Sequence, residues 1–237
     1  MNAKRCYGSP PPGVDLARLS GMLFVIEGAD SSGCSTQIEM LSQWLQQRGS
    51  AVVSTGLTRS TLIGKAIGRA KEGNVLSPRT MSLFYATDFY DQLENVIVPA
   101  LRAGNVVLAD RYIFTLLARD IVRGAEPGWT ESLYSMALVP DAVFFLAASP
   151  QTLVERTLST HHRLDYWESG MDLGISRDWL DSFVRYQARL HREFNALAHR
   201  FGFQTINANR SVRAVQEDLR AGIAAVMDAG RVGAGAP

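Results

Sequence analysis

Short apolar runs of strand length alternate along the chain with longer stretches in which apolar residues recur at helical spacing. This alternation, and the near-continuous apolar character of the short runs, favour a parallel sheet covered by helices on both faces. We therefore predict one α/β domain, a three-layer fold around a parallel central sheet. The predicted strands lie at residues 22–27, 51–54, 106–110, 142–147 and 203–206. The predicted helices lie at residues 35–48, 62–71, 79–91 with an extension to 102, 113–122, 131–138, 177–200 and 212–227, with one more beginning at Pro150.

The two ends of the chain and one internal stretch depart from this periodicity. Residues 1–20 include a proline-rich sequence, so we expect a leader that is flexible or lies on the surface. Residues 161–174 are rich in charge, aromatic residues and glycine, which predicts a mobile loop, and we expect the short lid at about 157–174. The folded domain should then span 21–228, with a flexible tail at 229–237.

Composition narrows the function classes. The chain has 237 residues, of which 46% are hydrophobic and 20% charged, and its formal net charge is +1. Such a balance gives no reason to expect a nucleic-acid or membrane partner. No apolar run reaches the ~18–20 residues of a membrane span, and no charged and then apolar leader opens the chain. Two cysteines, Cys6 and Cys34, do not make a disulfide framework, so we expect a cytoplasmic protein.

The most specific motif lies between the first predicted strand and the helix after it. Residues 24–37 contain Gly28 and Gly33 at the spacing of the phosphate-binding P-loop, G-x-x-x-x-G-K-[ST]. A P-loop directs backbone N–H groups and a helix N-terminus at phosphate oxygens, and its Ser/Thr hydroxyl binds Mg2+. The pattern therefore predicts a site for ATP phosphates, with Mg2+ at Ser35. The residues predicted to form it are Gly28, Ala29, Asp30, Ser31, Ser32, Gly33, Cys34, Ser35 and Thr36.

Cys34 occupies the position of the P-loop lysine. A neutral thiol removes a charge aimed at the transferring group, and the loss of one such contact lowers the rate by on the order of 10²–10³. We favour a degenerate P-loop that still binds nucleotide over a glycine turn without a ligand. A helix N-terminus can lower a thiol pKa, which would make Cys34 reactive. The favoured alternative is a neutral small residue with no chemical role.

Together with the P-loop, motifs spread over residues 22–225 resemble the thymidylate kinase family. These motifs are Glu27–Asp30 with Ser35–Gln37, Leu76–Thr80 with Leu83–Phe84, Val98–Leu101, Asp110–Tyr112, Pro140–Asp141, and Leu164–Asp165 with Glu168. The resemblance implies a P-loop kinase fold with a short lid, and Mg2+-dependent transfer of the γ-phosphate of ATP to a deoxynucleoside monophosphate. It also implies a homodimer, with the helices between 79 and 101 as the contact.

The same resemblance implies roles for individual residues. Asp30 would lie beside the sugar and phosphate of the acceptor, Arg111 would hold the acceptor phosphate, and Asp110 would lie near Mg2+ and the transferring group. The residues expected to be catalytic are Asp30, Asp110, Arg111, Arg156 and Arg163, the last two as arginines of the lid. Those expected to bind the acceptor are Arg59, Phe84 (stacked on the base), Asp88, Arg111, Tyr112, Arg119 and Asp120.

Some of these residues have a purely structural alternative. Phe84 could belong to the core, Asp110–Arg111 could be a structural ion pair, and Arg156 could lie on a solvated helix face. The pair at 161–162 (His-His) could suggest a metal site, but no third ligand has a convincing spacing. A solvated lid is the favoured interpretation of that pair.

Five positions depart from the family pattern. Asp88 replaces a base-reading arginine. The other replacements are Arg119 for an aromatic residue, Asp120 at the polar position near the base, Tyr166 for a lid arginine, and Ala147 for an acidic residue. An ionised aspartate only accepts hydrogen bonds and would repel O4 of thymine. One hypothesis is therefore an acceptor other than dTMP, with an amino group on its base. The alternative is that Asp88 pairs with an arginine such as Arg119 and never meets a base.

The function that these observations favour is a nucleoside monophosphate kinase. The alternative is a nucleotide-binding protein with little or no kinase activity, which Cys34, Tyr166 and Ala147 would favour. A third and weaker hypothesis is a structural or regulatory protein that has kept only the fold.

Overall fold

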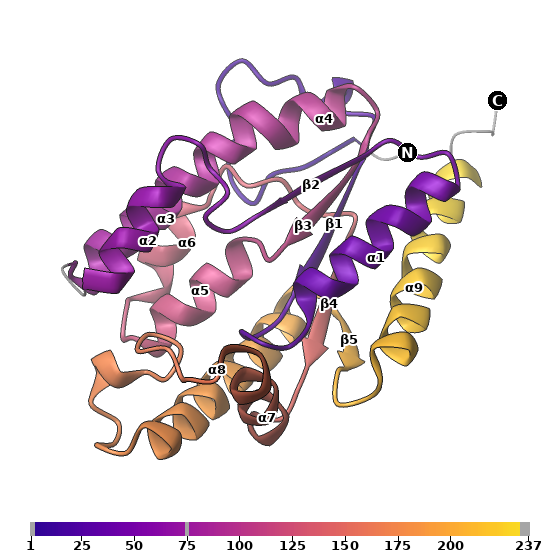
Figure 1. Cartoon of the computed structure of the whole chain (residues 1–237). Helices are drawn as coiled ribbons and strands as arrows, with labels where there is room; N and C mark the ends of the chain where they lie inside the picture. The colour runs from indigo at the N-terminus through magenta and orange to yellow at the C-terminus, as the bar shows by residue number, and fades with distance from the viewer. Residues whose placement is uncertain (1–2, 74–75, 233–237) are drawn as a thin grey trace.

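A parallel sheet of five strands forms the centre of the computed structural model, which describes residues 3–73 and 76–232 (Figure 1). The strand order is β2-β3-β1-β4-β5, so the first strand of the sequence lies in the middle. Every neighbouring pair is parallel, as the sequence pattern predicts. The strands are β1 (Met22–Glu27), β2 (Val52–Gly56), β3 (Val106–Asp110), β4 (Ala142–Ala147) and β5 (Gln204–Asn207).

Helices cover both faces of this sheet (Figure 1). They are α1 (Cys34–Gln47), α2 (Gly64–Gly73), α3 (Pro78–Gln92), α4 (Val98–Arg102), α5 (Ile113–Val122), α6 (Pro127–Leu133), α7 (Pro150–His161), α8 (Trp179–Phe201) and α9 (Val212–Val232). Alternate residues of β1 point to opposite faces, because Leu23 and Val25 enter one apolar cluster and Phe24 and Ile26 the other. The first cluster includes residues of α3, α5 and α8, and the second includes residues of α1 and α9. The predicted three-layer fold is confirmed.

The bounds predicted for the helix at 131–138 are wrong, since α6 runs from Pro127 to Leu133. Proline takes a position in the first turn, where its missing N–H breaks no helical hydrogen bond. The side chain of Glu126 accepts hydrogen bonds from two N–H groups of that turn. Proline therefore begins a helix here and does not interrupt one.

The N-terminal segment packs on the body of the protein. The ring of Tyr7 lies edge-on to those of Phe114 and Phe201, at centroid distances of 6.0 and 5.5 Å. Lys4 forms an ion pair with Asp141, at the start of β4. These contacts favour the surface-bound leader over the flexible one for the residues that make them.

The C-terminal helix α9 ends at Val232, so the tail predicted at 229–237 begins within a helix. Residues 233–237 lie outside the described part of the chain. Within 3–73 and 76–232, no helix combines the length and the apolar character needed to cross a membrane.

The two principal motifs meet at the carboxyl edge of the sheet, because the P-loop follows β1 and the Asp-Arg-Tyr segment follows the adjacent β3. Ile26 pairs with Asp110, and the N–H of Arg111 donates to the Ile26 carbonyl at 2.9 Å. Arg111 has a φ of 67°, a left-handed conformation that is uncommon for a residue with a side chain. This turn brings the guanidinium of Arg111 back to the P-loop residue Asp30. Ligands of open α/β sheets bind at this edge.

Candidate active site

Two glycines close the P-loop. Gly33, with a φ of 102°, directly precedes α1. A Cβ atom on Gly28 would lie 2.4 Å from Ser32 Oγ and 3.1 Å from Cys34 Sγ, so a side chain here would displace the Ser32 hydroxyl from beneath the turn. The loop and the first residues of α1 line one cavity, an arrangement suited to phosphate.

The thiol of Cys34 is buried beneath this loop. Cys34 is 3% exposed, and its Sγ lies 3.3 Å from Ser32 Oγ. Burial raises the pKa of the thiol to about 12, although the nearby guanidinium of Arg111 acts in the opposite direction. The thiol is therefore protonated at neutral pH, which favours the neutral small residue over a reactive group.

Two oxygen ligands meet where the P-loop approaches the end of β3. Ser35 Oγ donates to Asp110 Oδ2 at 2.7 Å, and Arg59 Nη2 donates to the same oxygen at 3.0 Å. Hydroxyl and carboxylate oxygens are hard ligands of the kind that Mg2+ prefers, and kinase sites hold Mg2+ with few protein ligands and the substrate phosphates. This pair therefore fits the Mg2+ expected at Ser35 and Asp110.

Asp30 organises two arginines across the cleft. Its Oδ1 accepts from Arg111 Nη1 and its Oδ2 from Arg119 Nη2, both at 2.6 Å. Burial alone raises the pKa of this carboxyl, but Arg111 and then Arg119 more than offset burial and hold the pKa well below its usual range. The carboxylate thus stays ionised and fixes both guanidinium groups beside the Ser35–Asp110 pair.

A buried glutamate holds the segment after β3 in place beneath the site. Glu27 Oε1 accepts from the N–H groups of Tyr112 and Thr115 at 2.9 and 3.3 Å, and Oε2 accepts from Thr115 Oγ1 at 2.5 Å. Burial raises the pKa of Glu27 to about 7, against the hydrogen bonds, which lower it. Glu27 therefore ties β1 to the turn that carries Arg111.

Replacing Glu27 by glutamine should change how stability depends on pH. Because folding raises the pKa of Glu27 from 4.5 to about 7, its contribution to stability is greatest below pH 4.5 and is lost as the pH rises through about 7. The free energy of unfolding of E27Q, minus that of the wild type, should therefore increase by up to roughly 3 kcal/mol across this window. Urea denaturation at a series of pH values measures this difference. A difference in the free energy of unfolding that does not vary with pH would contradict the raised pKa of Glu27.

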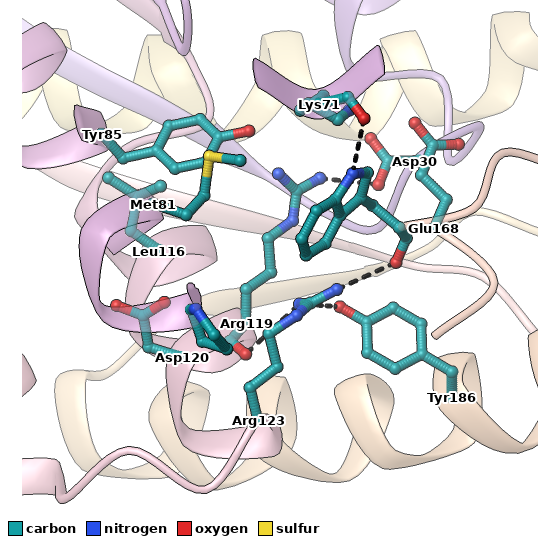
Figure 2. Close-up of a pocket in the computed structure, with 12 residues that line it drawn as sticks. Asp30, Lys71, Met81, Tyr85, Leu116, Arg119, Asp120, Arg123, Glu168 and Tyr186 are labelled. Atoms are coloured by element: carbon teal, nitrogen blue, oxygen red, sulfur yellow. Dashed lines mark hydrogen bonds and ion pairs between the residues drawn. The ribbon is translucent and has the colours of Figure 1, made fainter. Parts of the chain in front are cut away.

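A second cavity lies on the side of Asp30 where the acceptor is expected, and Figure 2 shows its lining. Its apolar wall comes from α3, α5 and the lid loop, with the residues Met81, Tyr85, Leu116 and Trp167. Its polar residues are Asp30, Lys71, Arg119, Asp120, Arg123 and Glu168. The combination suits a flat, mostly apolar ring with a few polar edge groups.

The ring of α3 that lines this cavity belongs to Tyr85, whereas Phe84 is half-buried against the core. Neighbouring residues of a helix point about 100° apart, so the two rings cannot share one face. This corrects the expected stacking of Phe84 on the base, in favour of its structural alternative.

Asp120 and Arg123 both come from the C-terminal end of α5 and its cap. Oδ2 of Asp120 is buried and has no hydrogen-bond partner among the described residues. Burial raises the pKa of this carboxyl to about 6, although the Ser82 hydroxyl and the guanidinium of Arg123 act in the opposite direction. Arg123 is engaged by contrast, since it donates to Asp172 at 2.8 Å, to Tyr186 Oη at 2.5 Å and to the Trp167 carbonyl at 2.9 Å. An unpaired buried acceptor favours a ligand that brings a donor.

The carboxylate of Asp88 faces the protein. Asp88 has no exposed surface, and its oxygens accept from the N–H groups of Thr58 and Ser60 at 2.8 and 2.9 Å. It therefore shapes the loop that carries Arg59. This corrects both roles expected of Asp88, because it neither faces the base cavity nor pairs with Arg119. The hypothesis of an amino-bearing acceptor loses its physical basis.

Tyr112 is likewise a structural residue. It is 3% exposed, its hydroxyl donates to the Leu138 carbonyl at 3.1 Å, and its ring lies edge-on to Phe89 at 5.3 Å. The acceptor-binding role expected of Tyr112 is corrected, because its ring lies in the core below the cleft.

The two expected lid arginines differ. Arg156 of α7 donates to the carbonyls of Ser32 and Ala208 at 3.0 and 2.7 Å, so it is held beside the P-loop and does not lie on a solvated face. Arg163 is exposed and makes no hydrogen bond or ion pair with another residue of 3–73 and 76–232. The catalytic role of Arg163 therefore stays a prediction.

The predicted lid is attached to the body at its tryptophan. Trp167 Nε1 donates to the Lys71 carbonyl at 3.0 Å, and the guanidinium of Arg123 lies 5.7 Å from the indole ring. His162 is exposed, and the side chain of His161 lies outside the described part. The described residues contain no group of three or more His, Cys, Asp or Glu side chains that could hold a metal. The solvated lid stays a prediction.

The cleft residues that were not among the predicted site residues include Lys71, Tyr85, Trp167 and Glu168. Two signals in the sequence point to members of this set. Glu168 belongs to a motif of the family resemblance, and Lys71 is one of only three lysines in the chain. Tyr85 and Trp167 carry no comparable signal, because aromatic residues at helical or loop positions are more often core.

Comparison with known proteins gives the same family as the sequence motifs. A sequence model of the family described as "Thymidylate kinase" matches residues 26–219. "Probable thymidylate kinase 2" of Saccharolobus solfataricus is 36% identical over 203 residues, covering 85% of this chain and 95% of the relative. "Thymidylate kinase" of Gloeobacter violaceus is 32% identical over 215 residues, covering 85% and 94%. The resemblance read from the motifs is confirmed, and the chain belongs to the thymidylate kinase family of nucleoside monophosphate kinases.

Proposed function

We propose that the protein transfers the γ-phosphoryl group of Mg-ATP to dTMP, with ADP and dTDP as products. The observation that carries the proposal is one cavity whose wall contains Ser35, Asp110, Arg59, Arg111 and Arg119. Phosphoryl transfer needs donor phosphates, metal and acceptor phosphate at one point, because positioning and charge supply most of the catalysis. The names of the relatives, described as thymidylate kinases, support dTMP as the acceptor.

On the donor side, backbone N–H groups of the P-loop and the N-terminus of α1 would hold the β- and γ-phosphates. Arg156 and Arg210 line the same cavity and add positive charge to it. Ser35 and Asp110 would hold Mg2+, which when bound neutralises charge on the β- and γ-phosphate oxygens. Cys34 supplies shape here and no charge.

On the acceptor side, Arg111 would hold the monophosphate, with Asp30 fixing the direction of its guanidinium. The base would enter the cavity of Figure 2, against Tyr85 and Leu116. The unpaired oxygen of Asp120 would accept the N3–H of thymine, which satisfies a buried acceptor that is otherwise orphaned.

Replacing Asp120 by alanine should weaken the binding of dTMP without affecting the binding of ATP. The loss of one buried hydrogen bond of about 1.5 kcal/mol corresponds to a rise in the KM for dTMP of about tenfold. Steady-state rates with each substrate varied in turn measure both constants. An unchanged KM for dTMP, or an equal rise in the KM for ATP, would contradict the contact with the base.

An assay of ADP release tests the proposed function directly. The purified protein receives Mg-ATP with dTMP, dCMP, CMP or dGMP in parallel, and a thermal shift with Mg-ATP reports donor binding. We expect stabilisation by Mg-ATP and fastest turnover with dTMP. Faster turnover of dCMP or CMP would show that dTMP is not the preferred acceptor. Stabilisation without turnover of any acceptor would favour a nucleotide-binding protein over a kinase.

A homodimer through α3 and α4 and a cytoplasmic location belong to the same proposal. The homodimer rests on the family resemblance. Cys6 and Cys34 are both free, which suits a reducing compartment.

A further inference from the structure

The cleft contains an ammonium group that no motif predicts. Lys71, near the end of α2, lines the cavity of Ser35 and Asp110 and also the neighbouring cavity expected for the base. It therefore borders the point at which donor and acceptor phosphates would meet. With Cys34 in the P-loop, this point lacks the ammonium that an ordinary P-loop provides.

The charge of Lys71 acts on carboxyls from both the P-loop and the lid. Burial raises the pKa of Asp30 and of Glu168, and the Lys71 ammonium acts on each of them in the opposite direction. Lys71 also lines one cavity with both Asp30 and Glu168, so its charge acts on the P-loop and on the lid within a single cavity. This is the region in which a transferring phosphoryl group would carry its negative charge.

The arginines of this cavity already have anionic partners. Arg111 and Arg119 share Asp30, and Arg59 pairs with the aspartate that ends β3. Among the described residues, Lys71 takes part in none of these ion pairs. It is therefore the cation of the cavity whose charge is available to a phosphate.

The backbone at Lys71 is hydrogen-bonded to the lid loop. Trp167 Nε1 donates to the Lys71 carbonyl at 3.0 Å, and Figure 2 draws this bond. The Trp167 carbonyl in turn accepts from Arg123 Nη2 at 2.9 Å, which connects the lid loop to the end of α5. The end of α2 is therefore fixed relative to both walls of the cavity, which limits where the ammonium can reach.

We propose that Lys71 supplies the positive charge at the transferring phosphoryl group that Cys34 does not supply. This role rests on the proposed kinase function. In the transfer, an oxygen of the acceptor monophosphate forms a bond to Pγ of ATP. The bond from Pγ to the β,γ-bridging oxygen breaks, and its electron pair leaves with ADP. Lys71 moves no proton, and its ammonium stabilises the charge on the γ-phosphoryl oxygens.

Replacing Lys71 by methionine removes the charge and keeps most of the side-chain length. We expect kcat to fall by on the order of 10²–10³, while the Kd of dTMP from titration calorimetry changes by less than about threefold because binding in the ground state is retained. Lys71→Arg should keep more of kcat than Lys71→Met. The matched control is Lys65→Met on the exposed face of the same helix, which should keep the kcat of the wild type. Thermal melting of each variant reports folding.

A second substitution separates charge from a structural role. Cys34→Lys places an ammonium at the cavity that Cys34 lines, and it should raise kcat in the Lys71→Met background by at least about tenfold. In the wild type its effect should be smaller, because the charge is already present. The role of Lys71 would be overturned if Lys71→Met keeps kcat within about threefold of the wild type. It would also be overturned if adding Cys34→Lys to Lys71→Met does not raise kcat. Absence of transfer by the wild type with every acceptor would instead overturn the proposed function itself.

Discussion

Replacing Asp30 by asparagine is expected to lower kcat/KM by about 10³ and to destabilise the fold by about 3–5 kcal/mol. Asp30 is the shared partner of Arg111 and Arg119, 2.6 Å from each, and its side chain is 14% exposed. Asparagine would leave two largely buried guanidinium groups without their anion, and an uncompensated buried charge is strongly destabilising. The two arginines would also repel each other and lose the orientation that suits the acceptor phosphate.

The carboxylate of Asp30 also makes the stability of the fold depend on pH in the acid range. Burial raises the pKa of Asp30, but the two arginines hold it well below its usual range. Its contribution to stability is therefore present above the pKa of an unfolded aspartate, about 3.9, and is lost as the pH falls toward the lower folded value. The Asp30→Asn variant should not show this loss of stability as the pH falls.

Assays of kcat/KM for dTMP, with urea denaturation at neutral and acidic pH, measure both effects. Asp228→Asn, on the exposed side of α9, is the matched control and should leave both unchanged. Activity within about tenfold of the wild type would contradict the role of Asp30 as the organiser of the two arginines.

Replacing Asp110 by asparagine is expected to have the second large effect on catalysis. Its carboxylate is the point where the Ser35 hydroxyl and the Arg59 guanidinium meet, at 2.7 and 3.0 Å. An amide keeps the shape but removes the negative charge that makes the pair a good Mg2+ site. We expect kcat to fall by on the order of 10²–10³. The Mg2+ concentration for half-maximal rate should rise, because the binding free energy of the ion is reduced.

Initial rates over a range of Mg2+, at saturating ATP and dTMP, separate the two effects. Ser35→Ala should shift the Mg2+ dependence in the same direction, since it removes the second oxygen ligand. If Asp110→Asn keeps both kcat and the Mg2+ dependence of the wild type, the metal is held elsewhere.

Much of the architecture could be predicted because it follows from local patterns. Continuous apolar runs place the strands in a buried parallel sheet, and two glycines at P-loop spacing place a phosphate site after β1. The order of the motifs then brings Asp110 and Arg111 to the same edge, because the ends of neighbouring parallel strands meet there. These inferences need no knowledge of where a side chain points.

The misassigned residues are those whose role depends on the direction in which the side chain points. Asp88 and Phe84 lie one turn apart on α3, and the resemblance fixes their positions but not which neighbours they face. The N–H groups of Thr58 and Ser60 take the Asp88 carboxylate, and that loop has no sequence pattern of its own. The position of Lys71 in the site could not be predicted for the same reason, because only the folded chain brings the end of α2 to the P-loop.

On the proposed function, this cleft performs phosphoryl transfer with a neutral thiol at the lysine position of its P-loop. The most direct measurement is the amount of dTDP and ADP formed from dTMP and Mg-ATP by the purified chain with Cys34 in place, resolved by chromatography. Phosphoryl transfer to dTMP predicts equal amounts of the two products, at a rate well above that of Asp110→Asn. Release of ADP without dTDP, or dTDP formation no faster than in that variant, would contradict it.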